Sequence, residues 1–163
     1  MANIFDTAVY ILKRKGNMSS QKLQILCYYA QAWSLVWDGQ PLFPEDFVAL
    51  KDSCLGPICP ELYKKIHNGF MIILKKESNL NNFTDVQKNT IDNVIECYGS
   101  CTESWLCRAS QNEYPWIKAV SKTNGRAGII TKDILAAYFS GIADATNAMG
   151  VHIQKAVDKP SDK

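Results

Sequence analysis

Cysteine and histidine offer the widest range of chemistry in this 163-residue chain, which holds six cysteines and two histidines. The cysteines are Cys27, Cys54, Cys59, Cys97, Cys101 and Cys107. A zinc site would need CxxC pairs or a mixed cluster of Cys and His, and neither pattern is present. We therefore expect inert thiols that behave as small buried hydrophobic side chains, with no metal and no cofactor.

Catalytic groups are equally hard to assemble from the sequence. A nucleophilic thiol needs a base within hydrogen-bond reach, but His67 ends a basic helical stretch and His152 lies near the end of the chain. Many carboxylates fall at expected helix starts, as Glu61, Asp85 and Asp133 do, where they suit the helix dipole. The segment "TNGRAG" matches neither phosphate-binding glycine pattern. The sequence therefore predicts a protein that is not an enzyme.

Charge and composition exclude further classes. The net charge is +2, and the basic stretches at 13–15, 64–65 and 75–76 are short, which disfavours nucleic acid binding. At the N-terminus the basic residues follow the apolar run, the reverse of a secretory signal, and no run approaches the ~20 residues of a membrane span. An apolar fraction of 47% suits one globular domain. We expect a cytoplasmic protein.

The segment that must organise this domain is 20–37, which contains "KLQILCYYAQAW". Ser19 or Ser20 can cap it, and Asp38–Gly39 can end it. Its apolar residues surround most of the circumference, which predicts a buried central helix. The structural hub is expected to comprise Leu23, Leu26, Tyr29, Ala30 and Trp33. The spacing of Gln24, Tyr28 and Gln31 leaves one narrow stripe that could touch water.

The other elements are expected to be mostly helices. Apolar periodicity and caps predict helices at about 4–14, 84–98, 102–109 and from 131 toward 157, with one helical turn near 117–120. A further helix is expected to begin at Pro57 or Pro60 and to run to about 67. Short strands are expected within 46–50 and 70–74, which could pair, and 121–128 is expected to be a flexible loop. The predicted class is mainly α with at most a small two- or three-stranded β element, in one domain over 1–157 with a disordered tail at 158–163.

Three stretches resemble one family. "SSQKLQILCYYAQAWSLVWDGQPLF" resembles the opening of the Panacea domain, the SocA-like antitoxin family that is also met in phage-associated proteins. "GPICPELYKKI" is similar to that family's "GPVVPELYREF". "SQNEYPWIKA" is similar to its "THxExPWxxA". The three blocks occur in the family's order and spacing over about 5–140.

Two departures from the family pattern stand out. Leu50 replaces the family's Trp, and roughly three extra residues precede Gly56. Gln111 replaces the family's His, which argues against any mechanism in which that His is a base or a metal ligand. The extra residues before Gly56 change the loop that would form part of a partner surface in the family.

The resemblance implies a non-enzymatic antitoxin that neutralises a neighbouring toxin by direct protein contact. The implied partner-binding residues are Gly56, Pro57, Pro60, Tyr63, Glu113, Pro115 and Trp116. A stripe of Ile142, Thr146, Met149 and Ile153 on the last helix could dock on the core or on a partner. A purely structural interpretation of the GP turn is that Gly56 supplies an unusual backbone angle and Pro57 starts a helix.

Other functions stay open at this point. A protease adaptor that delivers the toxin and a phage protein that counters a host defence would also bind protein. A nucleic-acid-binding regulator is disfavoured by the charge, and a Cys-dependent hydrolase or small metal protein by the cysteine pattern. A homo-oligomer is compatible with all of these.

Overall fold

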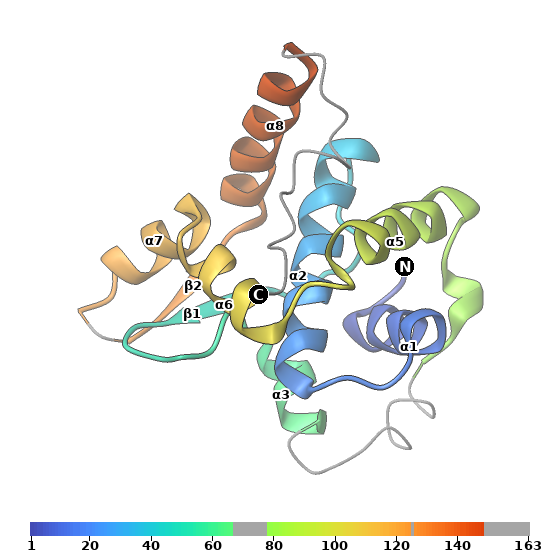
Figure 1. Cartoon of the computed structure of the whole chain (residues 1–163), viewed down its shortest axis with the longest axis horizontal. Helices are drawn as coiled ribbons and strands as arrows, with labels where there is room; N and C mark the ends of the chain where they lie inside the picture. Colours follow the sequence, from blue (N-terminus) through green and yellow to red (C-terminus); the bar gives the residue numbers. More distant parts are fainter. Residues whose placement is uncertain (67–77, 125, 149–163) are drawn as a thin grey trace.

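The computed structural model describes residues 1–66, 78–124 and 126–148, in which helices surround one long central helix (Figure 1). In chain order the elements are α1 (Ile4–Lys15), α2 (Ser20–Trp37), β1 (Phe47–Leu50), α3 (Pro60–Ile66), the 3-10 helix η1 (Leu80–Asn82), α5 (Asp85–Tyr98), α6 (Glu103–Gln111), α7 (Tyr114–Ser121), β2 (Ala127–Ile130) and α8 (Lys132–Ala148). None of the helices in these ranges combines the length and apolar composition that a bilayer span requires. The mainly α class is confirmed.

Helix α2 is the centre of the core. Every side chain from Leu23 to Ser34 is buried, because α1, α3, α5, α6 and α8 all pack against this helix. The predicted hub side chains all lie in the core, and they are Leu23, Leu26, Tyr29, Ala30 and Trp33. The expected buried central helix is therefore confirmed.

The predicted water-facing stripe on α2 is wrong, because Gln24, Tyr28 and Gln31 are all buried. The side-chain amide of Gln31 donates to the Phe43 carbonyl at 2.7 Å. The Gln24 amide accepts from the Cys59 N–H at 2.9 Å and donates to the Cys59 carbonyl at 3.3 Å. Polar groups can be buried at low cost when their hydrogen bonds are made. These side chains therefore anchor extended segments to α2.

The helix caps expected from the sequence are present. Ser19 accepts a hydrogen bond from the Lys22 N–H and caps α2. Thr84 and Gln87 form a reciprocal capping box at the start of α5. Gly16 ends α1 at a φ of 94°, a left-handed conformation that glycine adopts without strain. These local signals set where α1 ends and where α2 and α5 begin.

The described part of the chain contains one sheet of two antiparallel strands, in which Val48 of β1 lies opposite Ile129 of β2. The strand expected within 46–50 is confirmed as β1. Its expected partner at 70–74 lies outside the described residues.

The prediction of a flexible loop over 121–128 is wrong at both ends, because α7 extends to Ser121 and β2 begins at Ala127. A Cβ on Gly128 would lie 2.0 Å from the Ala119 carbonyl oxygen of α7, so only glycine lets this strand approach the helix so closely. Gly128 therefore permits close packing of β2 against α7 and is not part of a flexible loop.

Helix α7 also starts earlier than expected, at Tyr114, with Pro115 in its first turn. Helix α8 begins after Thr131, whose hydroxyl accepts a hydrogen bond from the Ile134 N–H, as the sequence predicts. The expected continuation toward Val157 and the tail at 158–163 lie outside the described residues. Within the docking stripe expected on this helix, Ile142 packs against the core.

Candidate partner-binding surface

The segment from Lys51 to Cys59, which we call the strap, leads from β1 to the residue before α3 and passes the N-terminal half of α2. Ile58 forms two backbone hydrogen bonds with Val48, so the end of the strap runs beside β1. Gly56 is buried, and a Cβ there would lie 2.8 Å from Ile25 Cδ1 and 3.0 Å from Ser110 Oγ. A side chain at this position would therefore require the Ile25 and Ser110 side chains to shift.

The structural interpretation of the GP turn is wrong in both parts. Gly56 has no left-handed backbone angle, since the positive-φ glycines among the described residues are Gly16 and Gly39. Pro57 lies outside the helix, and α3 begins at Pro60, the other start that the sequence predicts. Close approach, rather than backbone angle, explains the glycine.

Besides Gln24, which forms hydrogen bonds with Cys59 at the end of the strap, two glutamine side chains tie the strap to neighbouring helices. The Gln111 amide of α6 donates to the Ser53 carbonyl at 3.0 Å and to the Leu55 carbonyl at 2.8 Å. The Gln21 amide of α2 donates to the Cys54 carbonyl at 3.1 Å. The two departures from the family pattern are therefore in contact, because Gln111 donates hydrogen bonds to the longer loop before Gly56.

Glu113, at the N-cap of α7, joins that helix to α2. Its carboxylate accepts hydrogen bonds from the Tyr29 hydroxyl at 2.8 Å and the Tyr28 hydroxyl at 3.1 Å. Burial raises the pKa of Glu113 to about 7, although the hydrogen bonds from Tyr29 and Tyr28 act in the opposite direction. The position of α7 therefore depends on a carboxyl group whose charge changes near neutral pH.

The tyrosines extend this connection into the core. The Tyr29 ring stacks on the Tyr98 ring with centroids 4.0 Å apart, and the Trp33 indole N–H donates to the Tyr98 hydroxyl at 3.1 Å. Burial raises the pKa of Tyr29 and of Tyr98, so both phenols stay protonated and can donate. A chain of aromatic and polar contacts thus links α5 and α2 to the start of α7.

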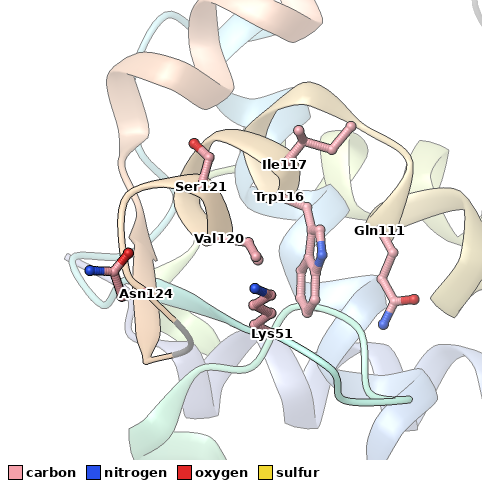
Figure 2. Close-up of a pocket in the computed structure, with 7 residues that line it drawn as sticks. All are labelled: Lys51, Gln111, Trp116, Ile117, Val120, Ser121 and Asn124. Carbon is pink, nitrogen blue, oxygen red and sulfur yellow. The ribbon is translucent and has the colours of Figure 1, made fainter.

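A hollow of about 400 Å³ opens between α7, the end of α6 and the start of the strap. Figure 2 shows the residues around it: Lys51, Gln111, Trp116, Ile117, Val120, Ser121 and Asn124. The Trp116 side chain forms part of the wall but is only 7% exposed, whereas Ile117 is 51% exposed. The hollow thus combines an apolar wall with one cation, Lys51.

A second, smaller hollow of about 30 Å³ lies beside the other end of the strap. Gly56, Pro57 and Tyr63 contribute to its lining, together with Gln21 and Gln24 of α2. Its volume is sufficient for about one or two water molecules, so it is a shallow depression rather than a ligand site. Tyr63 of α3 is 41% exposed beside it.

The predicted partner-binding residues therefore differ in how accessible they are. The buried ones are Gly56, Pro57, Pro115 and Trp116, the partly buried ones are Pro60 and Glu113, and the exposed one is Tyr63. The sequence reasoning did not single out Lys51 or Ile117 for this surface, and Ile117 directly follows the matched "PW". We call Lys51, Tyr63 and Ile117, with the two hollows, the strap surface.

The thiols lie mostly away from solvent. Cys54 is exposed, and the other five are buried. Burial raises the pKa of Cys59 to about 12 and also raises the pKa of Cys27 and Cys107, so these thiols stay protonated at neutral pH. Within the described ranges, no three His, Cys, Asp or Glu side chains gather as a metal site would require. His67 and His152 lie outside those ranges.

Comparison with known proteins gives one match. The family model described as "Antitoxin SocA-like, Panacea domain" matches residues 21–117, more than half of the chain. This range includes α2 from its second residue onward, the strap, α6 and the first residues of α7. No curated protein and no solved structure matches the sequence. The resemblance of the three sequence blocks is confirmed, and the chain belongs to the SocA-like antitoxin family of Panacea domains.

Proposed function

We propose that this protein is a non-enzymatic antitoxin that neutralises a partner toxin by binding it directly through the strap surface. The toxin would be encoded beside it in a bacterial, phage or prophage genome, and both proteins would act in the cytoplasm. Membership of the antitoxin family supports this role.

The observation that carries the choice of surface is an exposed apolar side chain at each end of a firmly held strap. Tyr63 lies beside one hollow, and Ile117 lines the other. The side-chain amides of Gln21, Gln24 and Gln111 all donate hydrogen bonds to carbonyl groups of the strap between them. Rigid surfaces lose little conformational entropy on binding, and aromatic anchors are frequent among binding hot spots.

A co-expression experiment tests the proposal. The tagged chain is expressed with the product of the neighbouring gene, and growth and co-purification are measured together. We expect the neighbour to be toxic alone, and to be harmless and bound in stoichiometric amount when co-expressed. A harmless neighbour, or a chain that elutes without it, would contradict the antitoxin role.

The choice of variants follows from burial. Trp116→Ala would remove a buried side chain and destabilise the fold, so it cannot isolate binding. Tyr63→Ala and Ile117→Ser change exposed side chains, and we expect each to weaken neutralisation while leaving the unfolding midpoint nearly unchanged.

The same experiment separates the antitoxin from a protease adaptor. An inhibitor that acts by contact leaves the toxin intact at its usual lifetime, whereas an adaptor shortens that lifetime. We expect the amount of toxin to stay constant after synthesis is stopped. Rapid loss of toxin that depends on this chain would contradict direct neutralisation and favour the adaptor.

A further inference from the structure

The hollow under α7 has a lining that indicates the chemistry of what it binds. One side is apolar and is formed by Trp116, Ile117 and Val120. Figure 2 shows Lys51 extending from beyond the end of β1 toward Val120 and Trp116. Lys51 therefore lines the same hollow as these apolar side chains.

Lys51 is a cation that has no counter-ion among the described residues. Among the described residues, Arg14 pairs with Asp92, Lys88 with Asp85 and Lys132 with Asp46. The Lys51 ammonium has no carboxylate partner in the same part of the chain. Asp52, its neighbour in the sequence, also forms no ion pair with it there.

The surrounding segment adds positive charge. Between Trp116 and Ile130 the charged residues are Lys118, Lys122 and Arg126, and this stretch has no aspartate or glutamate. None of these three side chains has an ion-pair partner among the described residues. A lysine without a counter-ion among the described residues, in the lining of an apolar hollow, favours an occupant with negative charge beside an apolar group.

We infer that this hollow binds an extended segment of the partner protein in which an apolar side chain is followed by a carboxylate. The apolar side chain packs on Trp116, Ile117 and Val120, and the carboxylate pairs with Lys51. This inference rests on the proposed function, because it specifies the chemistry of the partner at the strap surface. A single ammonium group against an apolar wall suits one carboxylate better than a phosphate backbone, which is bound by several cations.

Two matched peptides test the inference on the full chain. The probes are acetyl-Gly-Leu-Asp-Gly-amide and acetyl-Gly-Leu-Asn-Gly-amide, which differ only in the carboxylate. Binding is followed by NMR through the indole N–H of Trp116 and the backbone N–H groups of Ile117 and Val120. We expect the Asp peptide to bind about fivefold more tightly than the Asn peptide, since an exposed ion pair contributes up to about that factor.

Substitutions then assign the contacts. Lys51→Gln is expected to make the two peptides bind equally, and Ile117→Ser to weaken both. Lys13→Gln on α1, also at an exposed lysine, is the matched control and is expected to keep the fivefold preference. The inference is overturned if both peptides bind the unaltered chain alike, if neither shifts these resonances, or if a short single-stranded RNA binds here in preference to the Asp peptide.

The two proposals can fail separately. If the chain captures and neutralises its toxin but shows no preference for the Asp peptide, the inference about the hollow is wrong and the antitoxin role stands. If the peptides behave as expected but the neighbouring gene product is neither toxic nor bound, the antitoxin role is wrong and the hollow serves another protein partner.

Discussion

Asp6 and Glu113 are carboxylates that the fold encloses in two different ways. Asp6, in the first turn of α1, accepts hydrogen bonds from the backbone N–H groups of Asn3 and Asn79 and from the side-chain amide of Asn82. Glu113 accepts instead from the hydroxyls of two tyrosines. Burial raises the pKa of Glu113 to about 7.

The two carboxylates therefore have different roles. Asp6 holds the start of α1 and the segment around η1 together, whereas Glu113 supports the strap surface. Asp6 joins α1 to η1, far along the chain from the strap. Glu113 fixes the start of α7, whose next residues line the 400 Å³ hollow. We therefore expect changes at Asp6 to lower stability by removing these hydrogen bonds, and changes at Glu113 to affect stability in a way that depends on pH.

The largest expected effect is that of Asp6→Ala. The substitution leaves two backbone N–H groups and one amide without their acceptor, which we expect to cost about 4 kcal/mol of unfolding free energy. Urea unfolding measures this loss. Asp85→Ala, at an exposed acid in the first turn of α5, is the control and should cost less than about 1 kcal/mol. Equal losses in the two variants would show that the Asp6 contacts contribute little.

The second effect is a pH dependence that Glu113→Gln should remove. Because its pKa in the folded chain is about 7 against an ordinary value of 4.5, the folded chain keeps a proton that the unfolded chain loses in this range. The contribution to stability is complete below pH 4.5 and is lost as the pH rises through about 7. Between pH 4.5 and about pH 8 the unaltered chain should lose about 3 kcal/mol relative to the Gln variant.

Urea unfolding at a series of pH values measures this difference. Identical pH profiles for the unaltered chain and the Gln variant would mean that Glu113 does not take up a proton in the folded state.

A smaller effect is expected from Tyr29→Phe, which removes one donor to Glu113. The Tyr29 hydrogen bond lowers the pKa of Glu113, so its loss should raise that pKa further. We expect a cost of about 1.5 kcal/mol at about pH 8, where the carboxylate is charged, and a smaller cost at about pH 5. Unfolding at both pH values checks this, and a larger cost at the lower pH would contradict the assigned direction of the hydrogen bond.

Much of this structure could be predicted because its signals are local. The stretch around Leu23 and Trp33 is apolar on most sides, and this pattern alone indicates a buried helix. Ser19 and Thr84 precede the helices that they cap, so their role can be inferred from neighbouring residues. The family motifs also drew attention to Glu113 and Trp116.

The remaining features depend on contacts between distant residues. Nothing near Glu113 in the sequence indicates that its partners are Tyr28 and Tyr29, which lie 85 and 84 residues away. The apolar pattern of α2 predicts its burial but gives no sign that Gln24 and Gln31 bind the backbone of Cys59 and Phe43. In the sequence Gly128 is typical of a loop, because its close contact with α7 involves a residue outside its own segment.

Two exposed apolar residues allow the most direct test of the strap surface. Ile117 on α7 is 51% exposed and Val86 on α5 is 62% exposed, so an aspartate at either position introduces a similar change at the surface. The amount of toxin retained by each tagged variant is compared with that retained by the unaltered chain. The account predicts at least a tenfold loss for Ile117→Asp and no loss for Val86→Asp, with both variants folded. Equal retention by the two variants would contradict binding through the strap surface.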